Sequence, residues 1–188
     1  MNARYRKEKA FNAIIYFLEH TSMCHKKKTY KLLWLLDSEH FQIIGRSITG
    51  YQYFAWKMGP VPTELHEAIE SRDDAEFEEF FDVDRREDGK YVTITLVPKE
   101  GKSFDEKYFS RKEMELLEDL SRRYDMATGQ EMEDLTHRPG TPWYQVWEIE
   151  HRKQEAIPYE YALSGLASED KDIITNIAHE REAFLANY

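Results

Sequence analysis

The chain has 188 residues, of which 41% are hydrophobic and 14% aromatic, and it carries a formal net charge of −10. This much apolar and aromatic material can build a core, which excludes global disorder, and the length predicts one domain. A single cysteine, Cys24, excludes an intramolecular disulfide framework and fits a reducing compartment. The longest apolar run, Leu32–Leu36, is far shorter than the roughly 20 residues of a membrane span, and the N-terminus has no secretory cleavage signal. We therefore expect a cytoplasmic protein that does not associate with membranes.

The charge is unevenly distributed. Residues 1–31 contain eight Lys and Arg against two Glu, or about +6, whereas residues 64–88 contain twelve Asp and Glu against three Arg, or about −9. A globally acidic protein binds nucleic acid poorly because phosphate affinity depends on Lys and Arg. An acidic face suits a basic protein partner, although solvated helix faces explain the same clusters.

Two helices are predicted at the start of the chain. The first runs from about Arg4 to Glu19, with apolar residues at steps of three and four that form one face. The second begins near Thr29, a possible N-cap, and is apolar nearly all round at Leu32–Leu36, which predicts a buried central helix. Gly45 is placed to end this helix in the left-handed conformation.

A short strand is predicted around residues 51–57, followed by a break at Gly59-Pro60. Pro62 and Thr63 then open an acidic helix toward Glu70, and a second acidic helix is predicted from about Asp74 to Phe81. Alternation along the strand places Tyr53 and Ala55 on one face and Phe54 and Trp56 on the other.

The clearest β signal is the alternating segment Tyr91–Val97, which follows Asp88-Gly89, a favoured two-residue hairpin turn, and stops at Pro98. The remainder is predicted to be helical. The start signals are capping boxes at Ser110/Glu113 and Thr128/Glu131, Thr141 before Pro142, and Ser168 before a last helix. We expect the inner side of that last helix to carry Ile173, Ile174, Ile177, Phe184 and Leu185. The fold class is therefore α+β and mainly α-helical, a compact helical domain with a small antiparallel sheet or hairpin.

Signals for chemistry are weak. The seven histidines form no HExxH or Cys-His cluster, and no phosphate-binding glycine motif is present. Cys24 lies beside His25 and a lysine run that would lower its pKa, but nothing nearby supplies an orienting group. We expect no enzyme activity, no cofactor and no metal, and a hydrolase that uses His137 or Cys24 is a third-ranked alternative.

Two surface segments are candidates for binding. In "HKKKTYK" the lysines Lys26, Lys27 and Lys28 offer contacts for phosphates and Tyr30 a ring for stacking, but the following apolar helix must be buried and cannot enter a groove freely. The other candidate combines the strand aromatics with the acidic helices, because aromatic residues left exposed are enriched at protein-binding hot spots. Its residues are Tyr53, Trp56, Glu64, Glu67, Glu76, Glu78 and Glu79.

Two segments together resemble a known family, the Panacea or SocA-like antitoxin domain. The first is "KLLWLLDSEHFQIIGRSITGYQYFAWKMGPVPTEL" (Lys31–Leu65), and the second is "LTHRPGTPWYQV" (Leu135–Val146). The residues that fit the family pattern in the first segment are Lys31, Leu32, Leu33, Asp37, Gly45, Thr49, Tyr53, Ala55, Trp56, Gly59, Pro60 and Val61; in the second they include His137 and Trp143. The resemblance covers about residues 8–150 of a single domain, 1–188, with a C-terminal helical extension at 151–188.

The resemblance implies an antitoxin that binds and neutralises a cognate toxin, and some family members are associated with phages or prophages. The implied partner is the cognate toxin, and the implied assembly is a homo-oligomer or a heteromeric toxin–antitoxin complex. The aromatic and acidic set above is the hypothetical toxin-binding surface. Lys31, Asp37, Gly59, Pro60, Val61, His137 and Trp143 would maintain the shared fold. The alternative is a nucleic-acid-binding transcriptional regulator, or phage-associated regulatory protein, that uses Lys26–Lys28.

Overall fold

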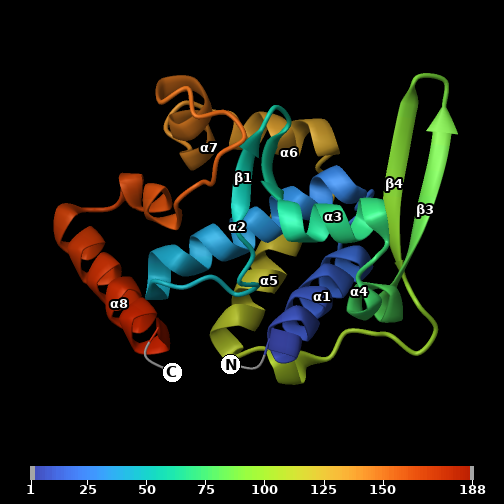
Figure 1. The fold of residues 1–188 in the computed structure, drawn as a ribbon, viewed down its shortest axis with the longest axis horizontal. Helices are drawn as coiled ribbons and strands as arrows, with labels where there is room; N and C mark the ends of the chain where they lie inside the picture. The colour runs from blue at the N-terminus through green and yellow to red at the C-terminus, as the bar shows by residue number, and fades with distance from the viewer. Residues whose placement is uncertain (1–2, 187–188) are drawn as a thin grey trace.

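Helix α2 (Lys26–Ile44) is the centre of the fold. The computed structural model describes residues 3–186, and in Figure 1 helix α2 crosses the middle of the molecule, with α1 (Ala3–His20) and α5 (Arg111–Tyr124) below it and α6 (Gly129–Thr136) above it. Leu32, Leu33 and Leu36 are completely buried, as the apolar run predicted. The mainly helical α+β fold class is confirmed.

The second helix begins earlier than predicted. Its N-cap is His25, so Thr29 is not the cap but lies in the first turn, where its hydroxyl donates to the His25 carbonyl oxygen at 3.2 Å. The predicted end is confirmed, because Gly45 has φ +66° and its N–H donates to the Phe41 carbonyl at 2.8 Å.

The predicted break at Gly59-Pro60 is wrong, because these residues begin a second strand. Strand β2 (Gly59–Pro62) pairs antiparallel with β1 (Tyr53–Trp56), and the chain turns at residues 57 and 58. Ala55 lies opposite Pro60. Its N–H donates to the Glu155 carbonyl and its C=O accepts from the Gln154 amide, both on the other side of β1. The missing N–H of the proline therefore costs no ladder hydrogen bond. Residues 154–157 thus add a third segment to this sheet, and Ile157 enters the core.

The second β element is a long hairpin that projects from the body (Figure 1), formed by β3 (Phe81–Asp88) and β4 (Tyr91–Pro98). Its loop is Gly89-Lys90 and not Asp88-Gly89, since Asp88 already pairs with Tyr91. Gly89 has φ +61°, and glycine at the first loop position is the signature of a type II′ turn.

The predicted helix starts in the second half of the chain are confirmed. Both capping boxes are formed. Thr141 is an N-cap whose hydroxyl accepts a hydrogen bond from the Tyr144 amide at 3.3 Å, and Pro142 is the first residue of the helix. The other elements are α3 (Thr63–Ser71), α4 (Ala75–Phe80), η1 (Glu106–Tyr108), α7 (Pro142–Tyr144), the π-helix η2 (Gln145–Ile149), η3 (Tyr159–Gly165) and α8 (Ser168–Ala186).

The inner side predicted for α8 is mostly wrong. Of the five apolar residues, Ile174 is buried, against Phe41 and Leu163, while Ile173, Ile177 and Phe184 are exposed. The side chain of Leu185 lies outside the described residues. Helix α8 packs at the edge of the molecule through one narrow stripe, so most of its apolar positions do not reach the core (Figure 1). None of the helices within residues 3–186 combines the length and apolar character required to cross a membrane.

Candidate partner-binding surface

Asp37 joins the central helix to the start of the first strand. Its carboxylate is wholly buried and accepts hydrogen bonds from the Ile48 amide at 2.7 Å, the Thr49 amide at 2.8 Å, the Thr49 hydroxyl, and the Tyr53 hydroxyl at 2.8 Å. Burial raises the pKa of Asp37, and these hydrogen bonds oppose the rise. This motif residue is therefore structural.

Tyr53 is consequently not available to a partner. Its side chain is completely buried, so the expectation that this ring lies on the surface is wrong. The alternation itself was predicted correctly, because Tyr53 and Ala55 are buried while Phe54 and Trp56 are half-buried. Since the hydroxyl of Tyr53 is bonded to Asp37, the polar end of the ring is satisfied inside the fold.

Lys31 is a second buried link, between α2 and β2. Its Nζ donates to the Pro60 carbonyl at 2.9 Å, and burial lowers its pKa to about 7. Gly59 has φ +99°, and a Cβ built on it would lie 2.7 Å from Lys31 Nζ and 2.9 Å from the Thr136 hydroxyl. Glycine at residue 59 therefore serves both the backbone conformation and the close approach of the lysine.

The two motif residues in the second segment also pack. Trp143 Nε1 donates to the Trp56 carbonyl at 2.8 Å, and His137 stacks on Trp143 with ring centroids 3.7 Å apart. Burial lowers the pKa of His137 and raises that of Cys24, which is opposite to the lowering expected for a reactive thiol. In the described part of the chain, no three His, Cys, Asp or Glu side chains are grouped as a metal site.

The lysine run is engaged within the protein. Lys28 is wholly buried and donates to the carbonyls of Ser22 at 2.6 Å and Asp125 at 2.7 Å, so its assignment to a nucleic-acid contact is wrong. Lys26 bonds Glu70 and Lys27 bonds Glu133, each at 2.6 Å. These three cations do not form the free basic strip that the alternative function requires.

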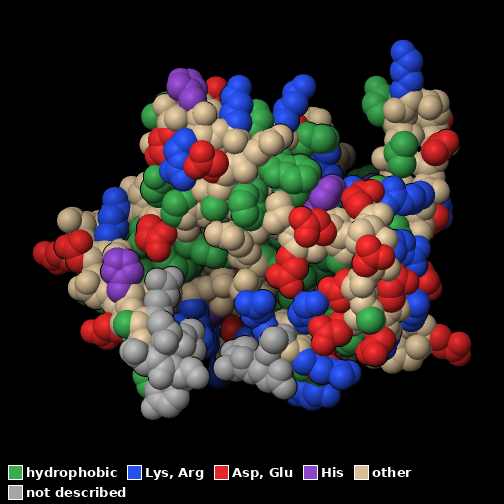
Figure 2. All heavy atoms as spheres, viewed as in Figure 1, with side chains coloured by type: hydrophobic (Ala, Val, Ile, Leu, Met, Phe, Trp, Pro, Cys, Tyr) green, Lys and Arg blue, Asp and Glu red, His purple; other side chains and the backbone are tan. Residues whose placement is uncertain are grey.

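The acidic helices face the basic first helix. Glu64 lies 4.0 Å from Arg6, Glu76 lies 3.3 Å from Lys7, and Glu79 lies 3.7 Å from Arg4. Arg72 donates to the Glu78 carboxylate from two of its guanidinium nitrogens, Nε and Nη2, each at 2.7 Å. Figure 2 shows acidic and basic side chains interspersed over the region of α1, α3 and α4. The two charge clusters in the sequence therefore neutralise each other in part, through Arg4, Arg6, Lys7 and Lys26. Glu67 is exposed on α3.

A groove of about 780 Å³ lies between the two β elements. The first turns of α2 line it, the β1–β2 turn with His66 borders one side, β4 borders the other, and residues of α6 and η2 close one end. Trp56, Met58, Val61, Val92, Ile94 and Trp147 make its surface largely apolar. The space-filling view shows a hollow between the projecting hairpin and the body (Figure 2).

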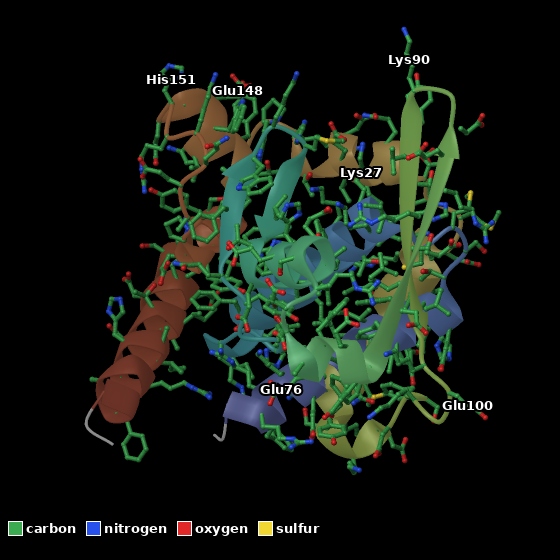
Figure 3. The ribbon with its side chains drawn as sticks, turned by 45° about the vertical axis from the view of Figure 1, so that its right-hand side comes forward. Lys27, Glu76, Lys90, Glu100, Glu148 and His151 are labelled. Atoms are coloured by element: carbon green, nitrogen blue, oxygen red, sulfur yellow. The ribbon has the colours of Figure 1, made fainter. Side chains whose placement is uncertain are left out.

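The groove is bordered by cations. Its lining contains Lys26, Lys27, Lys31, Lys57 and Arg85, and no Asp or Glu. Figure 3 shows Lys27 between the two β hairpins, close to α6, with Lys90 at the far tip of the β3–β4 hairpin. Glu70 pairs with Lys26 and Arg85, at 2.6 and 2.9 Å, and Glu133 pairs with Lys27 at 2.6 Å; neither acid is part of the lining.

The sequence reasoning missed this groove. In the sequence, Lys57 and Met58 are simply the two residues before Gly59-Pro60. Val92 is one position of the alternating segment Tyr91–Val97, and nothing marks it as a binding residue. The position of the hairpin depends on its core residues Ile94 and Leu96. Two polar contacts also fix it, from Arg85 to Glu70 at 2.9 Å and between His25 Nδ1 and Thr95 Oγ1 at 2.8 Å. Neither contact has a local signature in the sequence.

One of three comparisons with known proteins gave a match, and its range includes the motif residues from Lys31 to Trp143. The model of the SocA-like antitoxin, Panacea domain, family matches residues 30–144. Because this is 115 of the 188 residues, the chain belongs to this family. No curated protein and no solved structure matches the chain.

Proposed function

We propose that this protein is an antitoxin that neutralises a cognate toxin in the cytoplasm by binding it directly and not by catalysis. The observation that carries the proposal is membership of the SocA-like antitoxin family over residues 30–144. The residues that match the family pattern at Lys31, Asp37, Gly59 and Trp143 are buried and bonded within the fold. They supply a rigid framework, so contact with a toxin falls to the surface around them.

Two surfaces are available for this contact. One is the groove, whose aromatic and aliphatic lining resembles the apolar core of protein interfaces. The other is the acidic face predicted from the sequence, formed by Glu64, Glu67, Glu76, Glu78 and Glu79; Trp56, predicted with this set, lines the groove. A standard interface buries about 800 Å² on each partner, so a toxin would contact the residues around either surface as well as the surface itself.

We do not propose a nucleic-acid regulator. That function depended on Lys26, Lys27 and Lys28, which are bonded to Glu70, Glu133 and two backbone carbonyls respectively.

Co-expression with the product of the neighbouring open reading frame tests the proposal. We expect the neighbour alone to stop growth, growth to return with this protein, and a stable complex to co-purify. A frameshifted copy of the gene, transcribed but not translated, is the control and should not restore growth. Growth rescue without a complex, or a toxic neighbour that this protein neither binds nor neutralises, would contradict the proposal.

A further inference from the structure

We infer that the groove between the β1–β2 and β3–β4 hairpins binds a segment of the toxin in which apolar side chains are flanked by carboxylates. The inference rests on the proposed function, because it names the chemistry of the partner that the antitoxin would recognise.

Apolar side chains of the partner would be bound by the groove surface. Met58 is 49% exposed and Val92 57% exposed, and both lie in the lining with the half-buried rings of Trp56 and Trp147. Trp56 is held edge-on against His66 with centroids 4.8 Å apart, and Trp147 stacks on Trp143 at 5.4 Å. These rings are fixed before binding, so a partner side chain that covers them gains burial without an added cost of ordering them.

The sign of the partner's charge follows from the lining. Besides the buried Lys31, whose charge is weakened by burial, four Lys and Arg (Lys26, Lys27, Lys57 and Arg85) line the groove and no Asp or Glu does. Glu70 and Glu133 pair with three of these four, so the local formal charge without Lys31 is 4 − 2 = +2. The protein as a whole has a net charge of −10, so this positive region differs in sign from most of the surface. An acidic segment would be attracted here and repelled elsewhere, which favours one docking position.

The groove favours a protein segment over a nucleic acid. Phosphates would suit its cations, but Met58, Val61, Val92 and Ile94 offer no hydrogen bonds to sugar or base edges. Lys26 and Lys27 are already bonded to carboxylates at 2.6 Å, which reduces the counterion release that drives nucleic-acid binding. A protein segment that carries both apolar side chains and carboxylates matches the apolar lining of the groove and its cations.

Substitutions at Val92 separate charge from apolar contact. Val92→Glu and Val92→Lys remove the same apolar side chain and add opposite charges. We expect Val92→Glu to weaken binding of the co-expressed neighbour by about tenfold or more, and by at least about fivefold more than Val92→Lys. Val97→Glu is the matched control, because Val97 is an exposed valine of the same strand outside the groove, and its affinity should equal that of wild type.

Lys57 supplies a second pair of variants. Lys57→Glu should weaken binding by about tenfold, whereas Lys112→Glu on α5, an exposed lysine outside the groove, should not. Binding is measured by surface plasmon resonance, with circular dichroism to show that each variant folds. If wild type binds the neighbour and the groove variants bind equally well, the inference is overturned and the proposed function stands.

A probe peptide tests the groove even where the neighbour does not bind and the proposed function fails. The probe alternates Leu and Trp with Asp and Glu over seven residues, and its matched partner replaces the acids with Lys. We expect the acidic probe to shift the indole N–H signals of Trp56 and Trp147 in NMR spectra and the basic probe to leave them unchanged. Equal shifts with both probes, shifts with neither, or displacement of the acidic probe by a single-stranded oligonucleotide would overturn the inference. A second copy of this chain filling the groove, seen as dimers that Val92→Glu dissociates, would overturn it as well.

Discussion

Lys31 Nζ donates a 2.9 Å hydrogen bond to the Pro60 carbonyl oxygen, and this bond ties the central helix to strand β2. The neighbouring Gly59 leaves room for the lysine, since a Cβ there would lie 2.7 Å from Nζ. The Gly-Pro pair therefore provides the space and the hydrogen-bond acceptor for a buried lysine. The fixed φ of Pro60 restricts the backbone of β2, which forms one side of the groove.

Lys31 should make stability depend on pH. Its pKa is about 7 in the folded protein and 10.5 ordinarily, so between these values the unfolded chain binds a proton that the folded chain does not. The free energy of unfolding therefore rises with pH across this window, by about 2 to 4 kcal/mol between pH 7 and 9.5. Lys31→Met should lose this rise in urea unfolding, while the exposed Lys57→Met keeps it. An identical pH slope in Lys31→Met and wild type would show that Lys31 titrates normally.

Tyr53 should matter for stability and not for binding. Tyr53→Phe removes the hydroxyl that donates to Asp37 at 2.8 Å, and we expect a loss of about 1–3 kcal/mol in unfolding free energy. Tyr91→Phe, at an exposed ring of the hairpin, should change stability by less than about 0.5 kcal/mol. Toxin affinity should be the same for both variants below their unfolding temperatures. A Tyr53→Phe protein that is stable but binds weakly would return Tyr53 to the contact surface.

The parts of the fold that could be predicted are those with local signals. The capping boxes at Ser110 and Thr128 and the left-handed cap at Gly45 are completed by residues within a few positions, and all three formed. The parts that failed depend on distant residues. Gly59–Pro62 became a strand because β1 pairs with it and residues 154–157 take the other edge of β1.

The candidate site was predicted less well than the fold, for the same reason. The number of charged residues in each segment identified the basic and acidic clusters. It could not predict that Lys7 forms an ion pair with Glu76, or that Lys28 donates hydrogen bonds to two backbone carbonyls, because these groups come together only in the folded chain. The groove depends on where a whole hairpin is held. It could have been suspected only from Met58 and Val92, apolar residues at a turn and near a hairpin tip.

A buried ion pair joins α1 to α5. Lys9 Nζ lies 2.7 Å from Glu113 Oε1, and Glu113 Oε2 accepts the capping-box bond from the Ser110 amide. Burial by itself would raise the pKa of Glu113, but the bonds from Lys9 and Ser110 outweigh it and the pKa is lowered. Glu113→Gln keeps the cap but leaves Lys9 buried with a neutral partner, and should cost about 3 kcal/mol.

The second substitution tests the cause. Adding Lys9→Met to Glu113→Gln should restore part of the loss, because the unpaired charge is then removed. Glu115→Gln on the exposed side of α5 is the control and should cost less than about 0.5 kcal/mol. A Glu113→Gln variant as stable as this control would show that the pair contributes nothing.

Glu70 should contribute to stability only above acidic pH. The hydrogen bond from Lys26, aided by Arg85, lowers its pKa to about 2 from an ordinary 4.5. Its stabilising contribution is therefore complete above pH 4.5 and is lost as the pH falls toward 2, and solvent screening limits it to about 1 kcal/mol. Glu70→Gln should be less stable than wild type at pH 6, and the deficit should fall to less than half of that value at pH 3. Glu67→Gln on the same helix is the control, and a Glu70→Gln deficit that is unchanged at pH 3 would contradict this account.

Charge reversal on the acidic helices measures what that face adds to binding of the proposed toxin. Glu67 and Glu79 are the most exposed carboxylates of the predicted set, so Glu67→Lys with Glu79→Lys changes the surface field with little loss of internal pairing. If the acidic face steers the toxin, the association rate should fall and lose its dependence on salt, while the dissociation rate stays near wild type. Glu115→Lys with Glu118→Lys, at two exposed acids on α5, makes the same change in net charge and is the control. An association rate equal to that of the control would remove the acidic face from the interface. The groove would then be the surface that recognises the toxin, and the two clusters that dominate the charge of the sequence would serve to hold α1 against α3 and α4.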